Sequence, residues 1–250
     1  MRTHRGIGHP ATAGLVSVGL LLLALTSRAQ AADDWQQGIN YYLIEPPQPT
    51  SLPAGKIEVT EVFSYACPAC NHFYPTIDQL RTSLPSNAEL DFVPAGFNPA
   101  EDWPMFQRAY LAAQILGIDK RTHDAMFDAI WKTGELAVVD PRTGRIKTPA
   151  PSIQDAAAFY ARTAGIKPET FLAAANSFGV DSRIRQADQL VKDYRVESTP
   201  TIVVNGKYRI TQQSAGGPDQ VIQLVKWLVA KESAASPKST PTGAAKGSSH

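Results

Sequence analysis

The segment FSYACPACNHFYP, residues 63–75, holds the only two cysteines of this 250-residue chain, Cys67 and Cys70, in a C-x-x-C arrangement. Such a pair can clip a metal ion, form a structural disulfide or take part in thiol exchange. Which of these applies depends on the structure that flanks the pair and on the compartment in which the chain works.

Two patterns with different periods meet at the cysteine pair. The preceding stretch KIEVTEVF, residues 56–63, alternates as a strand does. The following stretch repeats apolar side chains at helical spacing, at Phe73, Ile77 and Leu80. The motif therefore lies where a strand leads into a helix.

A cysteine at the start of a helix is predisposed to react. Pro68 fits the first helical turn, where its missing N–H costs nothing, and it leaves Cys67 at the helix N-terminus. Free backbone N–H groups and the helix dipole stabilise an anion there, so we expect a lowered pKa for Cys67 and an exposed nucleophilic sulfur. Cys70, one turn later on the same face, is the more buried resolving partner.

The other two interpretations of the pair are weaker. A structural zinc site needs four ligands, and only His72 follows the pair closely, whereas His123 and His250 are far away in the sequence. A structural disulfide between Cys67 and Cys70 would close a tiny loop, worth about 2 kcal/mol. About 200 residues of ordinary apolar content bury a core without such a bond. We therefore expect no metal site and a reactive pair.

Glu61 shares its predicted strand face with Val59 and Phe63, which is a costly position for a carboxylate that has no partner. One interpretation makes Glu61 a buried proton acceptor for Cys70. The alternative is a twist at the end of the strand that turns Glu61 to water, since the apolar Val62 on the other face already breaks the alternation.

The first 31 residues predict export. Arg2 and Arg5 precede an apolar run at residues 15–25, which is shorter than the ~20 residues that span a bilayer. Ala29-Gln30-Ala31 is a small-x-small cleavage signal, so we expect a signal peptide over residues 1–31, with an uncleaved anchor as the alternative. Cleavage after Ala31 changes the formal net charge from +1 to −2, which does not favour nucleic acid or anionic membrane as a partner.

Three stretches resemble one known family. EVFSYACPACNHFYP, residues 61–75, resembles the active-site segment of thioredoxin-fold proteins, and specifically of the DsbA family of exported thiol oxidants. VESTPTIVVNGKYRI, residues 196–210, is similar to the family segment around its cis-proline, and AGIKPETFLAAANSF, residues 164–178, to its helical insertion. The resemblance covers residues from about 41 to 231.

The resemblance implies a reaction and a set of roles. It implies a cis peptide bond at Thr199-Pro200 that faces Cys67, with the backbone of Thr199 pairing with a substrate chain. It also implies a periplasmic enzyme that donates the Cys67–Cys70 disulfide to cysteines of newly exported proteins through a mixed disulfide. No cofactor is needed, because the disulfide itself carries the electrons. A quinone-linked membrane partner of the DsbB type would reoxidise the pair.

The sequence departs from the family pattern at three places. Ala69, which completes the active-site motif with Pro68, stands where a histidine is common, and losing that contact costs about 1.5 kcal/mol, or roughly 30 mV. Thr199 replaces a common valine and is familiar in isomerases. No basic residue is evident near Glu61 in ELDFVP, residues 89–94. Redox potential and substrate preference therefore stay open.

The patterns and the resemblance together predict an α/β thioredoxin fold, in which helices flank a central mixed sheet and a long all-helical insertion interrupts it. INYYLIEP, residues 39–46, is a candidate edge strand, and ELDFVP is a further strand. TIVVNGKYRI indicates two strands joined by a two-residue turn at Asn205-Gly206. PDQVIQLVKWLVAKE, residues 218–232, is an amphipathic helix.

The predicted domain boundaries follow from these elements. Residues 32–101 form the first part of the thioredoxin-like domain, 102–194 the insertion, 195–232 the second part, and 233–250 a disordered tail without aromatic residues. The insertion is expected to hold helices at residues 103–117, 120–134, 152–165, 168–178 and 181–194.

Two other functions stay open from the sequence. One is a disulfide isomerase or reductase on the same fold, which normally needs a dimerisation module. No such module is evident ahead of residue 57, and we expect a monomer. The other is a peptide-binding, chaperone-like domain with a vestigial disulfide. It would keep peptide binding after Cys67→Ser, whereas an oxidase would lose all turnover.

Overall fold

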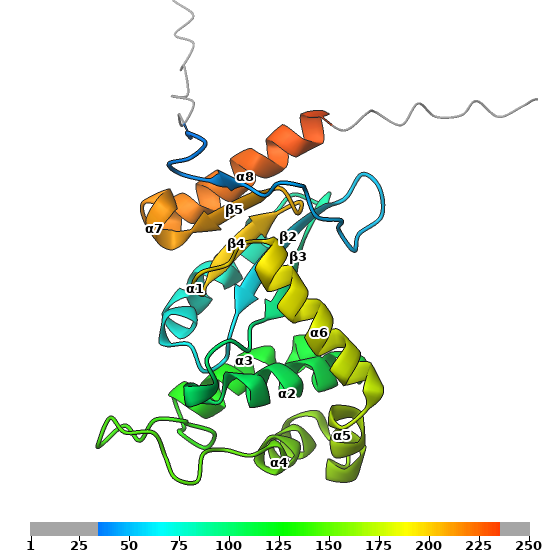
Figure 1. Ribbon diagram of the computed structural model, residues 1–250, viewed down its shortest axis with the longest axis vertical. Helices are drawn as coiled ribbons and strands as arrows, with labels where there is room; N and C mark the ends of the chain where they lie inside the picture. Colours follow the sequence, from blue (N-terminus) through cyan, green and yellow to red (C-terminus); the bar gives the residue numbers. More distant parts are fainter. Residues whose placement is uncertain (1–34, 236–250) are drawn as a thin grey trace, which may run out of the picture. The chain divides into compact units, whose positions relative to one another are not determined.

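The computed structural model describes residues 35–235, so the predicted signal peptide and residues 236–250 of the predicted tail lie outside the described part of the chain. Residues 35–235 form a five-stranded mixed sheet with helices on both faces (Figure 1). The strands are β1 (Tyr42–Leu43), β2 (Ile57–Phe63), β3 (Ala88–Pro94), β4 (Thr201–Val204) and β5 (Tyr208–Thr211), in the spatial order β1-β5-β4-β2-β3. The predicted thioredoxin fold with a helical insertion is confirmed.

Strand β2 is the central strand and carries the chain to the cysteine pair. It runs parallel to β3, with Glu61 opposite Phe92, and antiparallel to β4, with Glu61 opposite Ile202. All seven residues of β2 are buried. A strand that is covered on both faces holds apolar residues on both, which explains why Val62 interrupts the expected alternation.

Strands β4 and β5 form the predicted hairpin. Asn205 and Gly206 adopt φ angles of 53° and 63°, and the N–H of Lys207 donates to the carbonyl of Val204 at 3.0 Å, as in a two-residue turn of the Asn-Gly type. A Cβ at Gly206 would lie 2.2 Å from the carbonyl oxygen of Gln48, so glycine is required for this close approach as well as for its φ.

Two helices, α1 (Pro68–Ser83) and α8 (Pro218–Ala235), pack on one face of the sheet. A four-residue helix, α7 (Gln212–Ala215), leads into α8. Helix α8 continues past the predicted boundary at Glu232, so the assignment of residues 233–235 to a disordered tail is wrong. The side chain of Ser233 explains the extension, because it accepts a hydrogen bond from Asn87 at 2.8 Å and ties the last turn to the body of the domain.

The helices expected in the insertion are present, with small shifts at their ends. They are α2 (Trp103–Ile115), α3 (Asp119–Trp131), α4 (Ile153–Ala164), α5 (Pro168–Ala175) and α6 (Phe178–Asp193), preceded by a short 3-10 turn, η1 (Pro99–Glu101). Ser152 and Asp155 form the predicted capping box at the start of α4. Helix α6 then returns across the face of the sheet opposite α1 (Figure 1).

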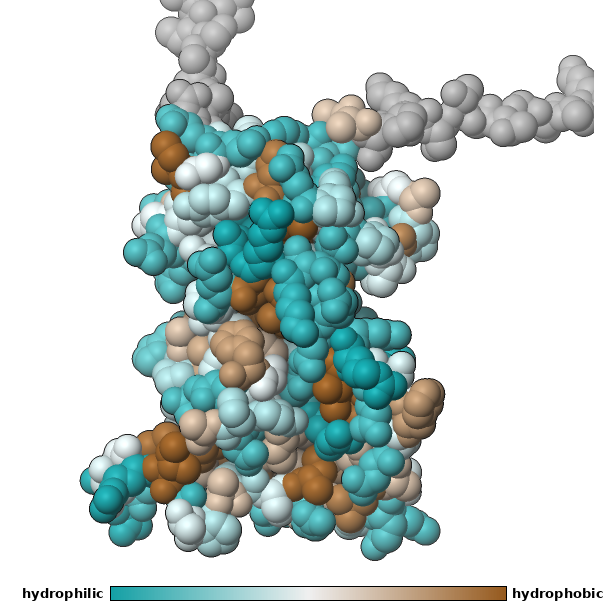
Figure 2. Space-filling view, in the orientation of Figure 1, coloured by the Kyte–Doolittle hydropathy of each residue, from teal (hydrophilic) through white to brown (hydrophobic). Residues whose placement is uncertain are grey.

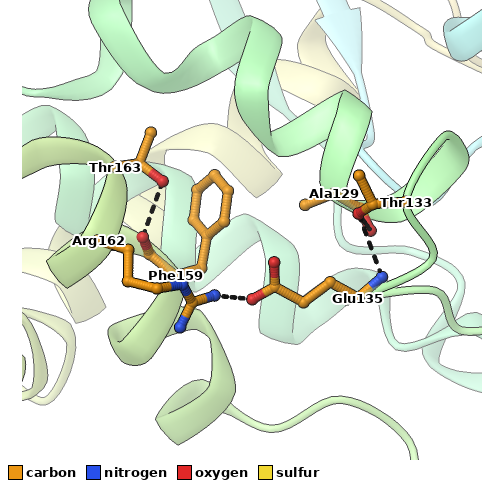
Figure 3. A network of polar contacts seen from close by, with 6 residues as sticks. All are labelled: Ala129, Thr133, Glu135, Phe159, Arg162 and Thr163. Atoms are coloured by element: carbon orange, nitrogen blue, oxygen red, sulfur yellow. Dashed lines mark hydrogen bonds and ion pairs between the residues drawn. The ribbon is translucent and has the colours of Figure 1, made fainter.

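The long connection between α3 and α4 is held by one contact within itself and one with α4. An isolated β-bridge joins Val139 to Ile146 within it. Figure 3 shows Arg162 of α4 reaching the carboxylate of Glu135, which follows α3, and this ion pair links α4 to the first part of the connection. Figure 2 shows a mainly hydrophilic face with scattered hydrophobic residues. Two exposed hydrophobic residues, Val139 and Ile146, belong to the connection between α3 and α4. No helix within residues 35–235 is both long enough and apolar enough to cross a bilayer.

Candidate active site

The cysteine pair lies at the junction of β2 and α1. Cys67 is the N-cap residue of α1 and Pro68 occupies the first helical turn, as the sequence predicts. The N–H of Cys67 donates to the carbonyl of Ser64 at 3.1 Å, and the sulfur of Cys67 accepts from the N–H of Cys70 at 3.4 Å. A tight turn therefore places Cys67 at the N-terminus of a helix whose amides point at its sulfur.

Both cysteines are free thiols here, and they have opposite acidities. The pKa of Cys67 is lowered to about 6, first because the Cys70 thiol donates a hydrogen bond to its sulfur, with the Cys70 and Ala69 amides also contributing. Burial opposes this effect. The pKa of Cys70 is raised, first by burial and then because its proton is engaged with Cys67. The helix amides therefore contribute less to the acidity of Cys67 than the neighbouring thiol does, which differs from the sequence-based expectation.

Cys67 is less accessible than the expected exposed nucleophile. Its exposed fraction is 5%, against 0% for Cys70, whereas Pro68 and Ala69 beside it are exposed. The order of burial agrees with the prediction, but only a small part of the Cys67 side chain is open to an attacking sulfur.

Glu61 is buried under the cysteine pair with an exposed fraction of 3%, so the interpretation that a twist turns it to water is wrong. Burial raises its pKa well above the ordinary value, and a negative charge on Cys67 raises it further. Its neighbours in register are the apolar Phe92 and Ile202, and no side chain among the described residues makes a hydrogen bond or ion pair with it. Burial therefore favours the protonated, neutral carboxyl group over the carboxylate.

The second half of the fold supplies the opposite wall of the site. The Thr199-Pro200 peptide bond is cis, and the Cys67 thiol donates to the carbonyl of Thr199 at 3.5 Å. The hydroxyl of Thr199 is buried and has no partner at hydrogen-bonding geometry within residues 35–235. It nevertheless lies close enough to Cys67 to help lower the pKa of that thiol. The hydroxyl is thus placed to donate to the sulfur once Cys67 loses its proton.

A surface hollow of about 670 Å³ adjoins this wall. Ala69 and the cis-proline segment line it together with residues of β5 and α7; its lining includes Tyr42, Glu197, Ser198, Arg209, Gln212 and Gln213. Ala69, two positions after Cys67, contributes a small side chain to this lining. His72 lies on the helix surface, where its Nδ1 donates to the carbonyl of Pro68 at 2.8 Å.

Three residues of the site were not identified from the sequence. Tyr65 is almost fully buried in the turn before Cys67, and helix α3 contacts it through His123 and Trp131. The sequence separates Tyr65 from Trp131 by 66 positions, and neither pattern nor spacing connects them.

Among the residues that the structure describes, no three histidine, cysteine or acidic side chains gather as metal ligands would.

Comparison with known proteins assigns the chain to a family. It matches a thioredoxin family model over residues 53–224. It is 35% identical over 224 residues to the thiol:disulfide interchange protein DsbA of Pseudomonas aeruginosa, covering 90% of this chain and 98% of that protein. A crystal structure of the P. aeruginosa DsbA matches with a TM-score of 0.68 and 36% identity, over 82% of this chain and 97% of the other.

A more distant structure has the same fold. The DsbA of Proteus mirabilis, solved with a non-covalently bound peptide PWATCDS, matches with a TM-score of 0.61 at 23% identity, over 78% of this chain and 98% of the other. Family model, sequence identity and fold all agree with the dithiol that opens α1. The chain belongs to the DsbA family of thiol:disulfide oxidoreductases within the thioredoxin-fold superfamily.

Proposed function

We propose that this oxidoreductase works as an exported dithiol oxidase that donates the Cys67–Cys70 disulfide to cysteines of newly exported proteins. The observation that carries the proposal is the low pKa of Cys67 beside the raised pKa of Cys70. A thiolate that is stabilised in the reduced protein favours the reduced form, so the disulfide form tends to oxidise other thiols.

The exchange proceeds in two displacements. A substrate thiolate attacks the sulfur of Cys67, the Cys67–Cys70 bond breaks, and a mixed disulfide between substrate and Cys67 forms. A second substrate thiolate then attacks the substrate sulfur of the mixed disulfide and releases Cys67 as a thiolate. The substrate loses two electrons and two protons, and the cysteine pair gains the two electrons.

Glu61 serves the proton balance of Cys70. When the Cys67–Cys70 bond breaks, Cys70 leaves as a buried thiolate, and the neutral carboxyl of Glu61 below it is a proton donor. When the pair is reoxidised, Cys70 must lose its proton, and Glu61 is then the acceptor. The raised pKa of Glu61 suits both directions, because it lies nearer to that of a thiol than an ordinary carboxyl does.

The substrate chain runs along the cis-proline segment. The backbone of Thr199, whose carbonyl oxygen lies 3.5 Å from the sulfur of Cys67, offers this chain hydrogen bonds, and Pro200 follows directly in the cis form. The hollow next to Ala69 takes the flanking side chains. Support comes from the P. mirabilis protein of the same fold, which binds a cysteine-containing peptide.

The remaining parts of the proposal extend the family likeness. The protein is a periplasmic monomer whose signal peptide, residues 1–31, is removed after Ala31. It uses no cofactor besides its own disulfide, and a quinone-linked membrane protein of the DsbB type reoxidises it. Nucleic acid is not a partner.

The proposal is tested with the mature protein and a reduced, unfolded substrate that has two cysteines. Stoichiometric oxidised protein should convert the substrate to its disulfide, and Cys67→Ser should abolish this. Cys70→Ala has no disulfide to donate, so it is offered the oxidised substrate instead: the Cys67 thiolate should attack the substrate disulfide, release one substrate thiol and accumulate as the mixed disulfide. Faster rearrangement of scrambled disulfides than oxidation of dithiols would favour an isomerase, for which Thr199 is the sequence argument. Peptide binding without any thiol exchange would favour a chaperone-like domain.

A further inference from the structure

Helix α3 of the insertion holds the active-site turn through one residue, Tyr65. The indole N–H of Trp131 donates to the main-chain carbonyl of Tyr65 at 2.8 Å, and the hydroxyl of Tyr65 bonds Nδ1 of His123 at 2.9 Å. Tyr65 is thus gripped by its backbone and by its side chain from the same helix. In Figure 1 the turn between β2 and α1 lies directly beside α3.

Burying the imidazole of His123 at this position costs free energy. It is 6% exposed, its ring packs against those of Phe63, Phe92 and Phe127, and its Nε2 has no partner among the described residues. Burying an imidazole with one unsatisfied nitrogen is less favourable than filling the same space with an apolar side chain. The contribution that distinguishes His123 from leucine here is the bond from Nδ1 to Tyr65.

The two hydrogen bonds from α3 to Tyr65 affect Cys67, because the contacts of the Cys67 sulfur are long and therefore sensitive to the position of the turn. Tyr65 lies two positions before Cys67, inside the turn in which Cys67 N–H donates to Ser64. The sulfur of Cys67 stands 3.4 Å from the Cys70 nitrogen and 3.5 Å from the Thr199 oxygen. Of these two contacts, the one in which the Cys70 N–H donates to the sulfur favours a thiolate, so a displacement of the turn that lengthens it weakens the stabilisation of that anion.

We propose that His123 and Trp131 are positioning residues for the dithiol, acting on Cys67 through Tyr65. The helical insertion then has a part in setting how strongly the protein oxidises thiols, in addition to any part in substrate binding. The inference rests on the proposed function, because it concerns the same reactive cysteine.

The test separates position from simple loss of stability. The variants Tyr65→Phe and His123→Leu remove the side-chain bond from opposite sides, and Trp131→Phe removes the main-chain bond. Each should raise the pKa of Cys67, which is measured by titration of the thiolate absorbance. Each should also lower the equilibrium constant for oxidation of glutathione by about threefold or more. Combining Tyr65→Phe with His123→Leu should shift the pKa and the equilibrium constant no further than either change alone, because both remove the same hydrogen bond.

Two further variants complete the design. His123→Asn puts an amide group where Nδ1 lies and should restore values near those of the native protein. Thr122→Val is the matched control: Thr122 is the preceding residue on α3, is fully buried, and donates its hydrogen bonds to the carbonyls of Ile118 and Asp119, at 2.7 and 3.3 Å, and not to Tyr65. It should lower stability and leave the pKa of Cys67 unchanged.

The outcomes are distinct. Unchanged pKa and equilibrium in Tyr65→Phe and Trp131→Phe, or an equal shift in Thr122→Val, would overturn the positioning role. A native Cys67 as weakly acidic as free cysteine would instead contradict the proposed oxidase direction, whatever the variants do. If His123→Leu does not fold, Tyr65→Phe, which loses a single hydroxyl, decides the question.

Discussion

The thiol of Cys67 lies 3.5 Å from the carbonyl oxygen of Thr199, although 132 positions separate the two residues. This contact joins the two halves of the thioredoxin domain across the whole insertion. The carbonyl of Thr199 accepts a hydrogen bond from the thiol, whereas the side chain of Thr199 helps to lower the pKa of Cys67. The acidity of Cys67 therefore depends on residues from both halves of the chain.

Replacing Cys70 should reveal the largest contribution to that acidity. In Cys70→Ala the thiol donor is lost, and we expect the pKa of Cys67 to rise from about 6 toward that of free cysteine. Cys70→Ser keeps an O–H donor and should stay closer to the native value. The pH dependence of alkylation of the single remaining cysteine measures both. Equal values in the two variants would contradict the assigned order of causes.

Replacing Thr199 should weaken the oxidant. Thr199→Val removes the buried hydroxyl while keeping the shape, and we expect an equilibrium constant with glutathione about fivefold lower, as for one lost hydrogen bond of about 1 kcal/mol. Thr199→Ser retains the hydroxyl and serves as the control. If valine leaves the constant unchanged, the hydroxyl does not contact the thiolate.

Glu61→Gln should stabilise the reduced protein at pH 7. The pKa of Glu61 is raised on folding, so the folded state retains a proton that the unfolded state releases, and stability is lost as pH rises above the unfolded value. Glutamine has no such penalty. Urea unfolding at pH 7 and at pH 4 should show a gain that is present at pH 7 and vanishes at pH 4.

Glu58 on the same strand provides the control for this experiment. It is also buried, but its carboxylate accepts hydrogen bonds from Ser51 N–H at 2.8 Å, Ser51 Oγ at 2.5 Å and Thr60 Oγ1 at 3.2 Å. Glu58→Gln should therefore destabilise, by about 1–3 kcal/mol. Destabilisation by both substitutions would mean that Glu61 has a native partner and is charged.

His123 should make the protein sensitive to mild acid. Burial lowers its pKa to about 4, so between about pH 6.5 and 4 the unfolded chain takes up a proton that the folded protein refuses. Stability from this residue falls by roughly 3 kcal/mol over that window as the pH drops. The unfolding free energy of the native protein, relative to His123→Leu, should decrease accordingly. Parallel pH profiles would show that His123 is protonated in the fold.

The strand, helix and hairpin around the site could be predicted because each has a local cause. Pro68 and the two cysteines specify the helix start, and Asn205-Gly206 specifies the turn. The edge strand and the helices of the insertion follow from turn residues and periodicity in the same way.

Other features depend on tertiary contacts that no local pattern encodes. The burial of Glu61 follows from helices on both faces of β2, and a strand pattern alone left its exposure open. The grip of α3 on Tyr65 joins residues far apart in sequence, and His123 carries no periodic signal of its own. The last turn of α8 contacts the rest of the domain through Ser233 and Asn87, which are 146 positions apart.

The central claim is that the fold keeps Cys67 as a thiolate near neutral pH. Titration of the reduced mature protein, followed by thiolate absorbance, tests it most directly. We predict one cysteine that ionises with a pKa of about 6 and a second that stays protonated far above that pH. Ionisation of both thiols near the ordinary value of about 8.5 would contradict it.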